Sequence, residues 1–172
     1  EIASCIMLKG ITSEYLLHRA YPIKKGDKVL YHAAAGGVGQ ILCQWANALG
    51  AEVIGTVGSK EKEAIAKKNG CHHVINYTDT NFIEGVEKIA GKNGVDVVYD
   101  GVGIKTFEGS IETLKVRGMM VAFGNASGYV DTIDVKKHIN TKGLFFTRPS
   151  IAHYTMTREE LVESAKKVFD AI

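Results

Sequence analysis

The chain has 172 residues, of which 45% are hydrophobic and 23% are charged. This composition is average for a globular protein, so it excludes a disordered chain and favours one domain with a core. A formal net charge of +2 gives no electrostatic reason to expect nucleic acid or a membrane surface as a partner. The three cysteines are widely spaced and form no CxxC pair, which favours a reducing cytoplasm as the location.

The first expected element is a helix over residues 2–17, followed by a short strand over 28–32. Val38, Ile41, Leu42, Trp45 and Leu49 then share one helix face, and Gly50 is placed to end that helix. The uncharged stretch around them contains glycines and polar residues, which excludes a membrane-spanning helix. Further strands are expected at 52–57, 73–76, 95–99, 119–123 and 143–147, and further helices at 61–69, 82–90, 107–114 and from Thr157 onward.

Strands and helices alternate along the chain, a rhythm that produces parallel strands joined by right-handed crossovers. We therefore expect an α/β fold of the Rossmann type, a doubly wound parallel six-stranded sheet with helices on both faces. Residues 1–26 are expected to form a linking helix and entry segment. Residues 27–150 are expected to form the dinucleotide-binding domain, and 151–172 a carboxy-terminal helix that returns to a domain absent from this chain.

A glycine-rich turn follows the first expected strand and opens the next helix, where it spans Gly36, Gly37, Val38 and Gly39. At such a junction the free N–H groups of the helix and its dipole bind an anion, and side chains would obstruct the approach. The GxGxxG fingerprint is only partly met, because Ala34 occupies its first position. A plain tight turn is the alternative, but the strand–turn–helix context favours a nucleotide diphosphate.

The end of the second expected strand carries no carboxylate, which an NAD-selective domain places there to bind the ribose hydroxyls. Gly58 leaves space for a 2′-phosphate, Ser59 offers a hydroxyl, and Lys62 offers positive charge. The pattern predicts a preference for NADP(H). Lys60 is open to either interpretation, as a phosphate ligand or as a solvated helix start.

Six motifs together resemble the zinc-independent quinone oxidoreductases of the medium-chain dehydrogenase/reductase superfamily, and they cover nearly the whole chain. They are AAAGGVG at 33–39, QWA at 44–46, GTVG at 55–58, VINY at 74–77, VYD at 98–100 and FGN at 123–125. The resemblance implies NADPH as hydride donor and a quinone or other conjugated carbonyl compound as acceptor. It also implies an amino-terminal barrel-like catalytic domain, absent here, so we expect little activity from the isolated chain.

The resemblance assigns roles to individual positions. It implies a 2′-phosphate site at Gly58, Lys62 and Tyr77, and a diphosphate site at Gly37 and Val38. The nicotinamide side would be formed by Gly101, Val102, Phe123, Gly124, Asn125, Phe146 and Arg148. Phe146 is equally compatible with the core, and Asp100 is interpreted as a structural acid at a strand end. We expect no catalytic acid or base in this chain.

Lys9 stands where zinc-dependent members of the superfamily place a cysteine ligand, before the glycine that corresponds to Gly10. An ammonium group is not a zinc ligand at neutral pH, and the histidines and cysteines show no ligand spacing, so we expect no metal. Adjacent strand residues point to opposite faces, which excludes joint ligation by the pair His72 and His73.

The last expected strand, 143–147, is apolar and would form an edge of the sheet. The resemblance implies that two copies pair along this edge into a homodimer, whereas coverage by the carboxy-terminal helix is the alternative. Two other functions stay open: an enoyl-thioester or alkenal reductase of the same superfamily, and a non-catalytic nucleotide-binding module. Nucleic acid is not an expected partner.

Overall fold

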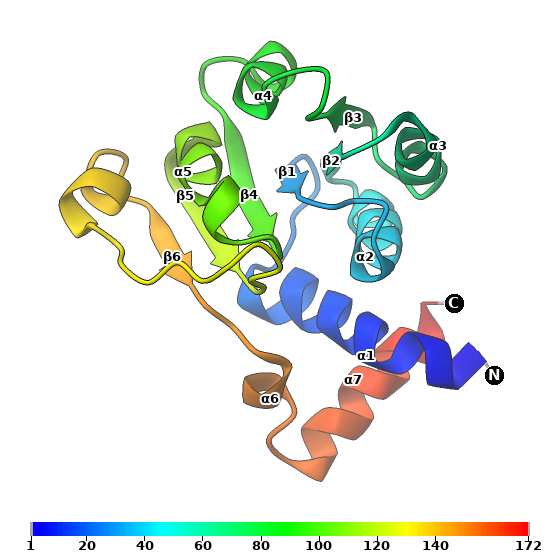
Figure 1. Cartoon of the computed structure of the whole chain (residues 1–172). Helices are drawn as coiled ribbons and strands as arrows, with labels where there is room; N and C mark the ends of the chain where they lie inside the picture. The colour runs from blue at the N-terminus through cyan, green and yellow to red at the C-terminus, as the bar shows by residue number, and fades with distance from the viewer. Residues whose placement is uncertain (1, 172) are drawn as a thin grey trace.

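The computed structural model describes residues 2–171, which form one parallel sheet with helices on both faces (Figure 1). The strand order is β3-β2-β1-β4-β5-β6, the order of a doubly wound nucleotide-binding fold, so the predicted fold class is confirmed. Its strands are β1 (Lys28–Tyr31), β2 (Glu52–Val57), β3 (His73–Asn76), β4 (Val95–Asp100), β5 (Leu114–Ala122) and β6 (Phe145–Thr147).

The helices divide between the two faces of this sheet. They are α1 (Ile2–Tyr15), η1 (Leu16–Ala20), α2 (Gly37–Ala48), α3 (Lys60–Lys68), α4 (Phe82–Ala90), α5 (Ile104–Thr113), η2 (Val135–Asn140), α6 (Ile151–Tyr154) and α7 (Arg158–Asp170). Successive residues of β1 point to opposite faces, so Val29 and Tyr31 pack in one core and Leu30 in the other. The first core contains residues of α1, α2 and α3, and the second contains residues of α4 and α5.

Most expected elements agree with the structure within a few residues, and three differ. Strand β5 begins at Leu114 rather than at 119, and its register against β4 shifts between Val95 and Val97. Helix α5 begins at Ile104 rather than at 107, because Gly103 adopts a φ of +97° and its carbonyl accepts from Thr106 and Phe107. Ile104 is exposed, so the apolar pattern misses this first turn. Strand β6 is shorter than expected, because Gly143 has a φ of +58° and the following amide still bonds back to η2.

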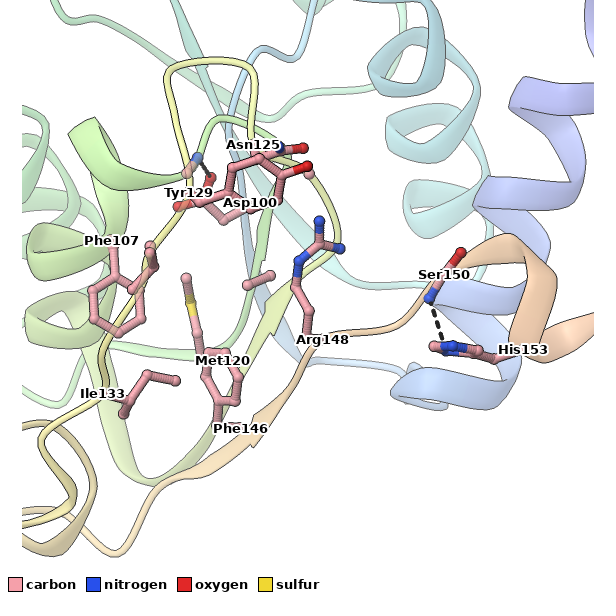
Figure 2. Close-up of a pocket in the computed structure, with 14 residues that line it drawn as sticks. Asp100, Phe107, Met120, Asn125, Tyr129, Ile133, Phe146, Arg148, Ser150 and His153 are labelled. Carbon is pink, nitrogen blue, oxygen red and sulfur yellow. Dashed lines mark hydrogen bonds between the residues drawn. The ribbon is translucent and has the colours of Figure 1, made fainter.

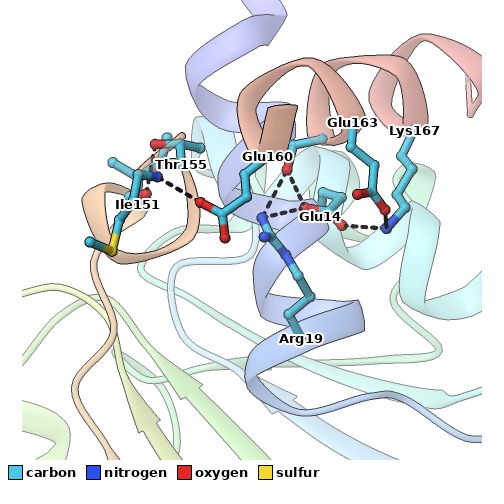
Figure 3. A network of polar contacts seen from close by, with 9 residues as sticks. Glu14, Arg19, Ile151, Thr155, Glu160, Glu163 and Lys167 are labelled. Carbon is cyan, nitrogen blue, oxygen red and sulfur yellow. Dashed lines mark hydrogen bonds and ion pairs between the residues drawn. The ribbon is translucent and has the colours of Figure 1, made fainter. Parts of the chain in front are cut away.

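Helices α1 and α7 pack against each other and are joined by a buried carboxylate (Figure 3). Glu14 of α1 is fully buried and accepts hydrogen bonds from Ser164 Oγ at 2.8 Å and Arg19 Nη2 at 3.0 Å. Lys167 Nζ lies 3.3 Å from the other carboxylate oxygen. A capping box between Thr157 and Glu160 begins α7, at the residue where the sequence placed the start of this helix. The carboxy-terminal helix therefore packs on α1.

Strand β6 remains an open edge of the sheet in this chain. Phe145 is 57% exposed, so the alternative that α7 covers this strand is wrong. Among residues 2–171, no helix has both the length and the apolar character needed to span a bilayer.

Candidate functional site

The turn between β1 and α2 lies at the carboxyl end of the sheet, beside the point where the strand order reverses. Gly36 is the N-cap of α2, so the amides of Gly37, Val38 and Gly39 are first-turn N–H groups without helical acceptors. A Cβ on Gly39 would lie 2.8 Å from the carbonyl oxygen of Ala33. Glycine thus allows the helix to start against the strand end, with its amides directed outward.

Ala34 departs from the glycine fingerprint without disturbing this turn. Its methyl group is completely buried and points at Gly55 of β2. A side chain on Gly55 would begin 2.6 Å from the Ala34 Cβ. The missing glycine of the turn is therefore compensated by a glycine in the neighbouring strand.

The end of β2 and the end of β3 meet at a second polar position. Gly58 faces the hydroxyl end of the Tyr77 side chain, so a Cβ on Gly58 would overlap the Tyr77 hydroxyl. The Tyr77 side chain is 55% exposed, and its amide donates to Val57. Ser59 caps α3 by accepting from the Lys62 amide, which places Lys62 in the first turn of that helix. The structure thus brings together Gly58, Ser59 and Tyr77, which the sequence assigned to one site.

The loops after β4 and β5 are in contact at a third position. The Phe123 ring covers Gly101, where a Cβ would lie 2.9 Å from the Phe123 ring, and Gly124 packs on the Gly101 backbone. The Ser127 amide donates a hydrogen bond of 2.7 Å to the Val102 carbonyl oxygen, and this bond connects the two loops. Asn125 lies close to Gly103 in the same arrangement. These glycines allow two backbones to approach more closely than any side chain would permit.

The Asp100 side chain binds the backbone of the loop that follows β4. Its buried carboxylate accepts from the amides of Val102 and Gly103 at 2.7 and 3.0 Å, and from the Ser110 hydroxyl at 3.1 Å. Ser110 also lies 2.9 Å from His32 Nε2, while His32 Nδ1 lies 3.0 Å from the Thr56 hydroxyl. Asp100 is therefore a structural acid, as the sequence indicated.

Burial determines the charge of the histidine in this network. His32 is nearly inaccessible, and loss of solvent lowers its pKa below 6.5, an effect that the charge of Asp100 opposes. The neutral ring is therefore the favoured form beneath the carboxyl ends of the strands.

A cavity of about 440 Å³ opens next to Asp100 and Asn125 (Figure 2). Figure 2 shows its apolar part, which is built from Phe107, Met120, Ile133 and Phe146. Arg148, which follows β6, points toward the loop that carries Asn125. The cavity thus combines an apolar wall with one cationic group, and it contains both Phe146 and Arg148 from the predicted site.

Lys9, which the sequence identified only as a residue unable to bind zinc, also lies in this region. Its side chain crosses from α1 to the start of α2, where a Cβ on Gly37 would meet Lys9 Cε at 2.6 Å and Nζ at 3.0 Å. Residues 28 positions apart meet here because α1 packs against α2. No sequence spacing predicts such a contact.

The histidine and cysteine side chains of the described residues lie apart from one another or have other partners. No group of three or more histidine, cysteine, aspartate or glutamate side chains in the described part of the chain is arranged to hold a metal. Cys43 and Cys71 are both buried free thiols on the α2 side of the sheet. His72 Nδ1 accepts from the Val53 amide, and His73 faces Glu52.

Comparison with known proteins agrees with this architecture. The family model described as zinc-binding dehydrogenase matches residues 37–171. The chain belongs to the zinc-binding dehydrogenase family. It is 51% identical to the 2-haloacrylate reductase of Burkholderia sp over 97% of its length, and 49% identical to quinone oxidoreductase 1 of Escherichia coli over 100%. The motif resemblance to quinone oxidoreductases is thereby confirmed.

The solved structures give the same result for this zinc-binding dehydrogenase chain. The crystal structure of Escherichia coli quinone oxidoreductase complexed with NADPH superposes with a TM-score of 0.94 at 48% identity. That match covers 98% of this chain and 52% of the other. The two curated relatives are covered over 50% and 53% of their own lengths, so the chain spans about half of each.

Proposed function

We propose that this chain binds NADPH and is the cofactor-binding half of an oxidoreductase that reduces a quinone or a similar conjugated carbonyl compound. One observation carries the proposal: two anion-binding positions lie at the carboxyl ends of neighbouring strands. The turn at Gly37 and Val38 suits a diphosphate, and the pocket of Gly58 and Tyr77 suits a 2′-phosphate.

The preference for NADPH over NADH rests on the chemistry around Gly58. A carboxylate at this strand end would repel a 2′-phosphate, and Ser59 stands there instead. The Ser59 hydroxyl, the exposed Tyr77 hydroxyl and the Lys62 ammonium are donors that a phosphate accepts from. The Escherichia coli relative whose structure contains NADPH supports the same assignment.

The nicotinamide end of the cofactor is assigned to the cavity beside Asp100. Gly124, Asn125, Phe146 and Arg148 line this cavity and would contact the ring, while Gly101, Val102 and Phe123 belong to the two loops beside it. When bound, NADPH supplies the hydride from this ring. The apolar wall would exclude water from the reacting face, and Asp100 would hold the Val102 and Gly103 amides in position.

A conjugated alkene is the second candidate for the acceptor. The relative named 2-haloacrylate reductase favours it, and it keeps open the reduction of enoyl thioesters or alkenals that the sequence suggested. Both candidates accept a hydride, so the cofactor-binding half would serve either one. In the remaining alternative, a non-catalytic nucleotide-binding module, NADPH would bind without any acceptor being reduced.

We further propose that the protein is located in the cytoplasm and works without zinc. An amino-terminal catalytic domain would form the other wall of the cleft. The described residues offer no zinc ligand set, which supports function without zinc. The exposed edge at Phe145 supports a homodimer in which two sheets join through β6. Stoichiometric zinc in a chelator-washed sample, or a monomer at high concentration by light scattering, would contradict these assignments.

The deciding experiment is calorimetric titration of the chain with NADPH and with NADH. We expect NADPH to bind more tightly, and Lys62→Met to remove most of that difference. Lys68→Met, at the other end of α3, is the matched control because it changes the net charge equally. Equal affinity of the parent chain for both cofactors would refute the NADPH assignment.

The acceptor is tested with a protein that joins this chain to the amino-terminal half of its relatives' length. NADPH oxidation would be compared with quinones, 2-haloacrylates, alkenals and enoyl thioesters as acceptors. The highest kcat/KM identifies the acceptor class. NADPH binding without turnover of any of them would favour the non-catalytic module.

A further inference from the structure

A lysine from outside the nucleotide-binding unit lies at the diphosphate turn. Lys9 belongs to α1, and the stem of its side chain lies over Gly37, the first residue of α2. The closest atoms to a Cβ built on Gly37 are Cε, Cδ and Nζ of Lys9, with Nζ at 3.0 Å. Glycine at position 37 leaves space for the stem in this position, although Lys9 is exposed and its side chain could shift. The ammonium group lies beside the first residue of α2.

This arrangement places like charges together. The amino-terminal end of a helix carries the positive end of the helix dipole, where an anion is stabilised and a cation is not. Helix α2 has no acidic residue in its first turn. None of the ion pairs among the described residues involves Lys9. The amino-terminal end of α2 and the Lys9 ammonium group are thus both positive, and no carboxylate balances them among the ion pairs of the described residues.

We propose that Lys9 is a ligand of the cofactor diphosphate, which lies between its ammonium group and the amides of Gly37 and Val38. This inference rests on the proposed function and adds a residue from α1 to the site. A phosphate oxygen at the turn accepts from the backbone amides on one side and from Lys9 on the other. Because NADPH and NADH share the diphosphate, Lys9 contributes equally to both. Lys62, by contrast, contributes only to the cofactor with the 2′-phosphate.

The test compares dissociation constants of NADPH and NADH for the chain and its variants at low salt. We expect Lys9→Met to weaken both cofactors by about tenfold, since a hydrogen bond to a charged group is lost. Lys9→Arg keeps the charge and retains most of the affinity. Lys25→Met is the matched control, because the Lys25 stem also packs over a glycine, Gly50, at the opposite end of α2.

Several results would overturn the inference. Unchanged affinity in Lys9→Met would show that its stem only packs on Gly37. If Lys9→Met weakened NADPH but not NADH, Lys9 would contact the 2′-phosphate rather than the diphosphate. If Lys25→Met weakened both cofactors as much as Lys9→Met does, the effect would come from net charge alone. Thermal unfolding of each variant separates lost binding from lost folding. A parent chain that binds neither cofactor would refute the proposed function as well, whereas normal parent binding with an unaffected Lys9→Met refutes this inference alone.

Discussion

Removal of the Asp100 carboxylate tests how the loop after β4 is held. The carboxylate is 1% exposed and accepts four hydrogen bonds. Two donors are hydroxyl groups with other acceptors: Thr106 can donate to Gly103 and Ser110 to Thr106. The other two donors are the amides of Val102 and Gly103, which have no second acceptor among the described residues. Asp100→Ala therefore leaves two N–H groups without their partner.

The cost follows from those two amides. Each buried donor without a partner costs about 1–3 kcal/mol, so we expect Asp100→Ala to lower the free energy of unfolding by roughly 3 kcal/mol. For a domain of this size that is a fall in Tm of roughly 6–12 °C. Asp100→Asn should cost about 1 kcal/mol, because its amide oxygen still accepts from both N–H groups.

The assay is urea unfolding of both variants followed by circular dichroism, with the exposed Asp131→Ala as control. NADPH affinity should fall in the same order, because the held loop carries the proposed nicotinamide contacts. Equal losses in Asp100→Ala and Asp100→Asn, or a loss below about 1 kcal/mol in Asp100→Ala, would refute the explanation by orphaned amides.

Three further predictions concern other parts of the molecule. Glu14→Ala should lower the free energy of unfolding by about 3 kcal/mol, because Arg19 and Ser164 lose their buried acceptor, while Lys167 keeps its ion pair with Glu163. Urea unfolding measures the loss, and a loss as small as that of a surface substitution would contradict the prediction. Burial lowers the pKa of His32, so the unfolded chain binds its proton more readily and stability should decline as the pH falls below about 6.5. His32→Asn should remove part of that decline in unfolding curves from about pH 8 to about pH 5, and an unchanged slope would contradict the assignment. Gly58→Ala should displace the Tyr77 ring and weaken NADPH by about tenfold with less effect on NADH; equal effects in titration would argue against a 2′-phosphate site there.

Local patterns predicted the elements that bear the cofactor site. The alternation of strands and helices predicted the sheet, because the spacing of apolar residues distinguishes a strand from a helix and shows which side of each element is buried. The turn at Gly36 to Gly39 was predicted from its glycines together with its place between a strand and a helix, because such a turn involves the backbone of only a few consecutive residues. The ends of α5 and β6 were placed wrongly, because Ile104 is exposed in a helix and Gly143 turns away from the strand direction.

The sequence by itself therefore determined the fold class, the glycine-rich turn that begins α2 and the residues at the end of β2. The tertiary structure alone decided how distant residues complete them. Gly55 makes room for Ala34, Gly124 packs on Gly101, and Lys9 reaches Gly37. These contacts arise where separate elements pack against one another, and no repeating pattern in the sequence indicates how closely two backbones approach.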